Sequence, residues 1–278
     1  MYKKIVVPLD GSPLAEVALP YAEEIAGKTA TKIVLLSVLP TEETHEYANH
    51  HAYAAKIVES TKRHVEKYLE TPISKTIDVA MATRVGSPAE GILDYINKGH
   101  LSLIVMATHG RSGLGRWAVG SVADKVVRGT SRQPLLLIRA KGAHPDIRAK
   151  RILKKALVPL DGSTGSEAVI PYIAQVASSL QMELTLLRVV SKNSHIAADA
   201  EAYLQRWCAQ FEEEGVSTRY EVRVGAAAEQ IIDVADELAS DLVAMSTQGQ
   251  SAISLWPLGS VAQKVLLGGN TPLLLIKA

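Results

Sequence analysis

The chain has 278 residues, of which 47% are hydrophobic and 21% charged, and its formal net charge is +1. This composition can fill the cores of two ordinary domains, and it argues against disorder and against a dedicated nucleic-acid binder. The single cysteine, Cys208, excludes an intrachain disulfide, and neither a signal peptide nor an apolar run of membrane-spanning length is evident. We therefore expect a cytoplasmic protein that binds no membrane.

The first half of the chain alternates apolar runs with helical patterns, beginning with a β-branched run typical of a strand buried on both faces. Ser12 and Pro13 are placed to cap and begin the first helix, and Pro20 is expected to kink it or to leave one carbonyl without a hydrogen bond. Ser87 and Glu90 form a capping-box pattern at the start of a later helix. The expected strands are 4–9, 31–39, 74–82, 101–107 and 134–139. The expected helices are 12–28, 43–70, 87–99 and 121–129.

The second half of the chain repeats the first. The segment KKIVVPLDGSPLAEVALPYAEEIA at 3–26 returns as KKALVPLDGSTGSEAVIPYIAQVA at 154–177, and matching segments follow in the same order up to the final strand of each copy. We expect two domains, 1–140 and 154–278, joined by an exposed linker at 141–153. The basic residues of the linker are expected to be solvated rather than to bind nucleic acid.

Each copy is predicted to be a doubly wound α/β domain with a five-stranded parallel sheet, because strands that alternate with helices pair in parallel through right-handed crossovers. Ligands bind to such sheets beyond the carboxyl ends of the strands, where the strand order reverses. Two features of each copy fall at this edge. They are the aspartate after the first strand, Asp10 or Asp161, and the glycine-rich loop after the fourth.

The loop of the first copy, ATHGRSGLGRWAVGS, holds four glycines, two arginines and no acidic residue. Gly110 lets the backbone turn away from the strand, and Gly120 and Ser121 open a helix whose first N–H groups have no intrahelical partner. These donors, the helix dipole, the Ser121 hydroxyl and the charges of Arg111 and Arg116 would form an anion site. The glycines also fit a plain turn with Ser121 as a helix cap. The spacing excludes a P-loop, a dinucleotide fingerprint and a nucleophile elbow.

At these residues the chain resembles the universal stress protein family, in its form with two fused domains. ATP-binding members of the family carry G-x2-G-x9-G-[ST] after the fourth strand. The first copy matches this pattern from Ala107 to Ser121 and the second from Ser246 to Ser260, with alanine and serine replacing the first glycine. The segments PLDGS, RVGSPAEGI, ATHGRSGL and GSVADKV also carry the resemblance, which covers nearly the whole chain.

The resemblance implies ATP, with or without Mg²⁺, lying across the ends of the strands. The aspartates would contact the ribose or the adenine. Backbone at the end of the second strand would lie beside the adenine, and methionines would line the base pocket. The loop residues would donate to the phosphates. The implied residues of the first copy are Asp10, Val38, Met106, Ala107, Gly110, Arg111, Gly120, Ser121 and Val122. Those of the second copy are Asp161, Val189, Met245, Ser246, Gly249, Gly259, Ser260 and Val261.

The two copies differ in the charge of their loops. Arg111 and Arg116 of the first copy correspond to Gln250 and Leu255 of the second. Since a charge-assisted hydrogen bond contributes about 1.5–3 kcal/mol, the first copy is predicted to bind ATP more tightly.

The function implied by the resemblance is that of an ATP-binding, stress-responsive regulatory module with slow or no hydrolysis. Family members dimerise through the last strand, so the two copies are expected to pair as a pseudo-dimer, and a homodimer stays open. One alternative is a nucleotide-cleaving or adenylating enzyme of the same fold group. Another is an interaction scaffold without a nucleotide.

Neither a catalytic residue nor a metal site is expected. Four histidines fall in the expected helix 43–70, but none of them has the spacing of metal ligands on a helix. We expect them on a solvated helix face. They are His45, His50, His51 and His64.

Overall fold

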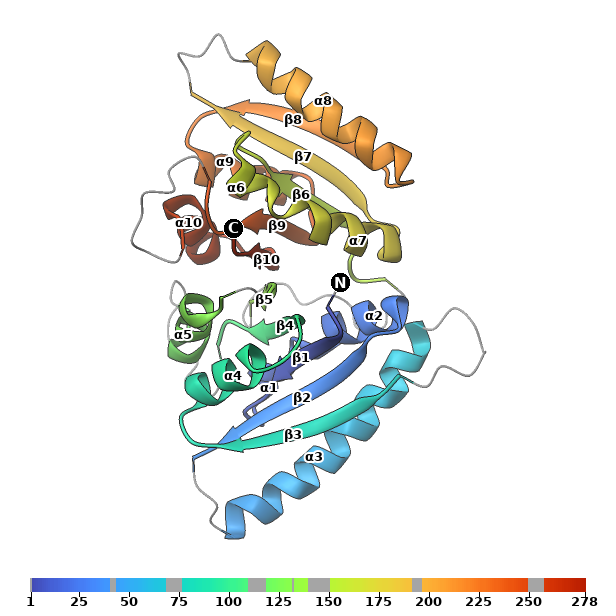
Figure 1. Cartoon of the computed structure of the whole chain (residues 1–278), viewed down its shortest axis with the longest axis vertical. Helices are drawn as coiled ribbons and strands as arrows, with labels where there is room; N and C mark the ends of the chain where they lie inside the picture. Colours follow the sequence, from blue (N-terminus) through green and yellow to red (C-terminus); the bar gives the residue numbers. More distant parts are fainter. Residues whose placement is uncertain are drawn as a thin grey trace. The chain divides into compact units, whose positions relative to one another are not determined.

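The computed structural model divides into two compact units, Met1–Ile152 (unit one) and Leu153–Ala278 (unit two). Figure 1 labels the elements of both. None of the helices in the described part of the chain combines the length and apolar character that a membrane span needs. The described residues are 2–40, 44–68, 77–109, 119–131, 133–139, 151–191, 197–249 and 258–278.

Unit one contains a parallel five-stranded sheet. Its strands are β1 (Lys4–Pro8), β2 (Lys32–Leu39), β3 (Val79–Val85), β4 (Ser102–Ala107) and β5 (Leu135–Ile138). They lie in the order β3-β2-β1-β4-β5, so that Val6 in the central strand is opposite Val34 on one side and Ile104 on the other. The apolar runs are buried because helices cover both faces of the sheet.

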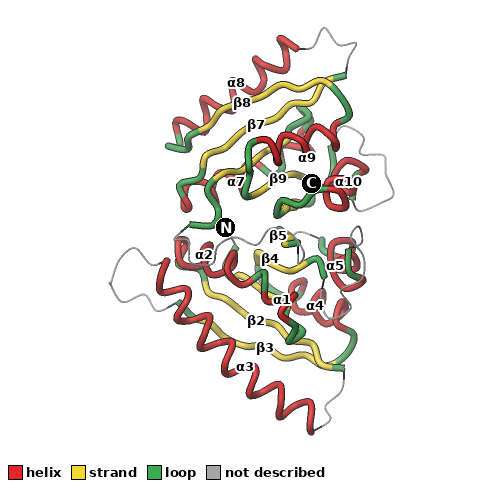
Figure 2. Tube along the Cα trace, turned by 180° about the vertical axis from the view of Figure 1, so that it is seen from behind, coloured by secondary structure: helices red, strands yellow, loops and turns green. Residues whose placement is uncertain are grey.

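Four helices of unit one pack in two pairs, α2 with α3 and α4 with α5. The helical elements of the unit are α1 (Pro13–Glu16), α2 (Leu19–Thr29), α3 (Thr44–Val65), the 3-10 turn η1 (Glu66–Tyr68), α4 (Pro88–Asn97) and α5 (Ser121–Gly129). Right-handed crossovers put the two pairs on opposite faces of the sheet. Figure 2 shows the same elements from behind.

Unit two repeats this architecture. Its strands are β6 (Lys155–Pro159), β7 (Glu183–Val190), β8 (Thr218–Val224), β9 (Leu242–Ser246) and β10 (Leu273–Ile276), in the order β8-β7-β6-β9-β10. Its helices are α6 (Thr164–Glu167), α7 (Ile170–Leu180), α8 (Ala197–Glu213), α9 (Ala227–Glu237) and α10 (Ser260–Gly268). The predicted fold class, two repeated and doubly wound five-stranded parallel sheets, is confirmed. The pseudo-dimer and the domain bounds stay predictions.

The first expected helix of unit one is broken into α1 and α2. Ser12 caps α1, since its Oγ accepts a hydrogen bond from the Ala15 N–H at 3.3 Å. Pro20 lies in the first turn of α2, where its missing N–H costs no intrahelical bond. The helix therefore ends at Glu16 and a new one begins at Leu19, so Pro20 lies at a helix start and not at a kink.

Two other local predictions differ from the structure. Strand β3 begins at Val79 and runs to Val85, because it pairs with β2 along this whole length, from Ile33 to Leu39. Ser87 is at the N-cap of α4, but its side chain makes no capping hydrogen bond, so the capping box is not formed.

Candidate functional site

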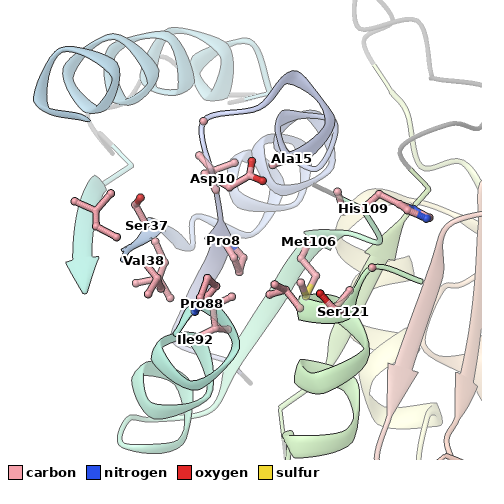
Figure 3. Close-up of a pocket in the computed structure, with 18 of the residues that line it drawn as sticks. Pro8, Asp10, Ala15, Ser37, Val38, Pro88, Ile92, Met106, His109 and Ser121 are labelled. Carbon is pink, nitrogen blue, oxygen red and sulfur yellow. The ribbon is translucent and has the colours of Figure 1, made fainter. Parts of the chain in front are cut away.

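A pocket of about 680 Å³ opens at the carboxyl ends of β1, β2 and β4 in unit one (Figure 3). Strands β2 and β4 flank β1, so this is the point at which the strand order reverses. Side chains of α3 and α4 and the first turn of α5 complete the lining. The pocket therefore lies where doubly wound folds bind their ligands.

The pocket brings together every residue predicted for the first copy that the structure describes. These are Asp10, Val38, Met106, Ala107, Gly120, Ser121 and Val122. The other two, Gly110 and Arg111, lie outside the described residues.

The position of Asp10 is fixed by a short turn. The backbone N–H and the hydroxyl of Ser12 both donate to Asp10 Oδ1, at 2.9 and 2.6 Å. Gly11 permits this turn because its φ of 80° lies in the left-handed region, which favours glycine. The carboxylate is thus oriented by the protein before any ligand binds.

The start of α5 supplies backbone donors. The Gly120 N–H donates to the Thr108 carbonyl at 2.7 Å, so this amide already has a partner within the protein, and phosphate binding by Gly120 stays a prediction. Gly120 is also the N-cap residue, which makes Ser121 the first residue of the helix rather than its cap. The amides of Ser121, Val122 and Ala123 have no intrahelical partner, and they stand at the positive end of the helix dipole. An anion is the ligand that this arrangement favours.

The side of the pocket formed by β2, α4 and β4 is apolar. Val38 of β2, Pro88 and Ile92 of α4, and Met106 of β4 lie around the same space (Figure 3). Helix α4 approaches β2 closely here, since a Cβ on Gly91 would lie 2.8 Å from Val38 Cγ1. This wall is suited to a flat, apolar group.

Helix α3 contributes two lining residues that the sequence analysis missed. His50 is buried, and its Nε2 lies 3.1 Å from Thr83 Oγ1. The Tyr53 hydroxyl donates to Glu16 Oε1 at 3.0 Å. Burial, and secondarily the neighbouring His51, lowers the pKa of His50, so the ring is neutral at pH 7. The prediction of a solvated His50 is wrong. The spacing of His50 and Tyr53, which puts them on one helix face, was the available signal.

His109 lines the pocket without turning its ring toward Asp10. Its Nδ1 lies 3.0 Å from Thr108 Oγ1, and Figure 3 shows the ring pointing away from Asp10 and Ser37. Within the described residues, no group of three or more His, Cys, Asp or Glu side chains is arranged to hold a metal ion.

Unit two places the residues predicted for the second copy at the same edge of its sheet. Asp161 follows β6, and Val189 lies in β7. Met245 and Ser246 end β9, and Gly249 lies three residues beyond it. Gly259 is the N-cap of α10, which begins with Ser260 and Val261.

Local hydrogen bonds of unit two repeat those of unit one. The Ser163 N–H and hydroxyl donate to Asp161 Oδ1 at 3.0 and 2.5 Å. The Gly259 N–H donates to the Thr247 carbonyl at 2.6 Å, so this amide is also used. The Ser246 hydroxyl, which replaces the first glycine of the motif, accepts from the backbone N–H two residues later at 3.3 Å.

Comparisons with known proteins agree with this architecture. The model of the universal stress protein family matches residues 1–139 and 153–277. A universal stress protein of Methanocaldococcus jannaschii is 28% identical over 165 residues, covering 51% of this chain and 98% of the relative. The crystal structure of a universal stress protein from Archaeoglobus fulgidus superposes with a TM-score of 0.74 at 17% identity, covering 100% of this chain and 99% of that one. A putative universal stress protein from Pseudomonas aeruginosa gives a TM-score of 0.71 at 20% identity, covering 99% and 93%. The chain therefore belongs to the universal stress protein family and carries two repeats of its domain.

Proposed function

We propose that unit one binds ATP, and that this cytoplasmic protein acts as a nucleotide-dependent regulatory module of the stress response. One observation carries the proposal. A single pocket joins the amide end of α5, the oriented Asp10 carboxylate and an apolar wall. Its volume of about 680 Å³ lies in the range of small-molecule sites.

The three parts of the pocket correspond to the three parts of a nucleotide. The phosphates would accept from the Ser121, Val122 and Ala123 amides, because a helix N-terminus favours anions. Asp10 would accept from the ribose hydroxyls. The base would lie against the apolar wall that includes Val38.

Binding is proposed as the main activity, with slow hydrolysis at most. The His109 ring points away from Asp10, so it is poorly placed to activate a water there (Figure 3). Asp10 is the one carboxylate among the described lining residues. A Mg²⁺ ion accompanying ATP would therefore be held mainly by phosphate oxygens and water.

Titration calorimetry of the full chain with ATP, ADP, adenosine and inorganic triphosphate tests the proposal. We expect ATP to bind most tightly and to be recovered intact by chromatography after incubation. Rapid conversion to ADP or AMP would favour the nucleotide-cleaving alternative. Absence of binding at millimolar ATP would favour the scaffold.

The Asp10→Asn variant is expected to bind ATP about 10- to 100-fold more weakly, because hydrogen bonds to a charged carboxylate contribute about 1.5–3 kcal/mol. An asparagine Oδ1 still accepts from Ser12, so the turn is kept. The measurement is a double-mutant cycle with ATP and its 2′,3′-dideoxy analogue. If Asp10 binds the ribose, the substitution should cost little with the analogue.

The matched control is Asp161→Asn in unit two, which is expected to leave the affinity of unit one for ATP unchanged. An equal loss of affinity for ATP and for the dideoxy analogue in Asp10→Asn would contradict the ribose role.

A further inference from the structure

The two repeats differ at one strand residue next to the pocket. In β2, Leu36 lies opposite Pro8 and is followed by Ser37, a small, buried lining residue. In β7, Leu187 lies opposite Pro159 in the same register, and the next residue is Arg188. Unit two thus carries a long cationic side chain at the strand position where unit one has a serine.

The guanidinium of Arg188 turns inward over the first loop of unit two. A Cβ on Gly162 would lie 2.6 Å from Arg188 Nη1, so the group rests directly on this glycine. Nη1 donates to the Leu160 carbonyl at 3.5 Å, a long hydrogen bond. Cζ lies 5.7 Å from the centroid of the Tyr203 ring, within the range of a cation–π contact.

The groups around this guanidinium have counterparts in unit one that line its pocket. Gly162 and Leu160 correspond to Gly11 and Leu9 through the repeated PLDGS segment. Tyr203 donates to Glu167 as Tyr53 donates to Glu16, at 2.8 and 3.0 Å. The counterparts Gly11, Leu9 and Tyr53, together with Ser37, all line the open pocket of unit one. The guanidinium therefore lies in a region of unit two that corresponds to one side of the pocket of unit one.

Two further close contacts lie near the same loop of unit two. A Cβ on Gly249 would overlap Asp161 Oδ2, so the backbone after β9 packs directly against the carboxylate. The Gln248 carbonyl also lies 3.4 Å from the position of a Cβ on Gly165, at the start of α6. The loop after β9 and the turn after β6 thus approach each other closely.

We propose that Arg188 is a built-in occupant of the nucleotide site of unit two, on the side that corresponds to Leu9, Gly11 and Tyr53 of unit one. It closes this side of the site, so that the chain binds one nucleotide, in unit one. The inference rests on the proposed function and adds to it the residue that separates the repeats. The guanidinium has the Leu160 carbonyl and the Tyr203 ring as partners, and an entering nucleotide would have to displace it from both.

Exchanging the two residues tests the proposal, with ATP as the probe and the stoichiometry per full chain as the readout. Wild type should bind one ATP, and Arg188→Ser should bind two. Ser37→Arg should weaken the site in unit one by about 100-fold or more, because the arginine side chain would fill part of the pocket and the nucleotide would bury less of its surface. The double variant should bind one ATP again. A gain of binding in Arg188→Ser cannot arise from misfolding.

The matched control is Arg206→Ser. Arg206 is an exposed residue of α8 whose Cζ lies 5.9 Å from the same Tyr203 ring, and its loss leaves Arg188 in place. This variant should bind one ATP, as wild type does. Two sites in wild type, or one site in Arg188→Ser, would overturn the inference while leaving ATP binding intact. No binding by any of these chains would overturn the proposed function and the inference together.

Discussion

The Gly120→Ala variant is expected to destabilise unit one by about 1–3 kcal/mol, the usual cost of overpacking, and to weaken ATP binding. The backbone conformation is not the reason, because φ of −59° and ψ of 148° suit any residue. The reason is space, since the added Cβ would lie 2.9 Å from the Thr108 carbonyl oxygen. Either this oxygen or the start of α5 must move, and the amides proposed to bind the phosphates move with the helix.

Thermal unfolding and ATP titration measure the two effects. For a unit of this size, each kcal/mol lowers the midpoint by about 2–4 °C. Gly99→Ala is the matched control, because its Cβ would meet nothing closer than Lys4 Nζ at 3.5 Å and the residue precedes β4, away from the pocket. We expect it to unfold as wild type does. Equal midpoints and equal affinities for all three chains would contradict the packing argument.

The same substitution in unit two separates stability from binding. A Cβ on Gly259 would lie 2.7 Å from the Thr247 carbonyl oxygen, so Gly259→Ala should destabilise its own unit comparably. ATP binding should be unaffected if the nucleotide occupies unit one alone. Loss of ATP binding in Gly259→Ala with retention in Gly120→Ala would reverse the ranking of the repeats.

The fold could be predicted because its signals are local. The run KIVVP needs no tertiary information to indicate a strand buried on both faces, and the alternation of such runs with helices fixes parallel pairing. Pro20 marked the break between α1 and α2 in the same way. Ser87 could not be judged locally, because its capping-box pattern is present without the hydrogen bond.

The site was predictable where its residues lie in short turns. Asp10, Gly11 and Ser12 bond to one another, so PLDGS predicts the geometry by itself. The use of the Gly120 amide was not predictable, since its acceptor is Thr108, at the far end of the loop.

The residues missed by the sequence analysis depend on how distant elements pack. The spacing of His50 and Tyr53 puts both on one face of the long helix α3, but the packing of α3 over the strand ends decides that this face is the buried one. Arg188 did leave a signal, because a charge within the apolar run LTLLRVV is unusual for a covered strand. The proposed role of Arg188 follows only from its alignment with Ser37 and from the direction of its side chain in the structure.

Ser121→Glu is expected to weaken ATP binding about 10- to 100-fold while leaving unit one folded. Ser121 is exposed and is the first residue of α5, where a carboxylate stabilises a helix by about 0.3–1 kcal/mol through its dipole. The same carboxylate would stand beside the phosphates. Two unit charges about 5 Å apart repel by about 1–3 kcal/mol at effective dielectric constants of roughly 20 to 80.

The charge effect has three signatures that a packing defect lacks. Adenosine, which has no phosphate, should bind Ser121→Glu as it binds wild type. The loss of ATP affinity should shrink as salt is raised, because screening weakens repulsion between partly exposed charges. Ser260→Glu, the same change at the first residue of α10, should leave the affinity of unit one for ATP unchanged. Calorimetry at low and high salt, with unfolding midpoints as the check on folding, measures all three. Unaltered ATP affinity in Ser121→Glu would show that the phosphates lie elsewhere, because a carboxylate at the N-terminus of α5 would repel a triphosphate bound there.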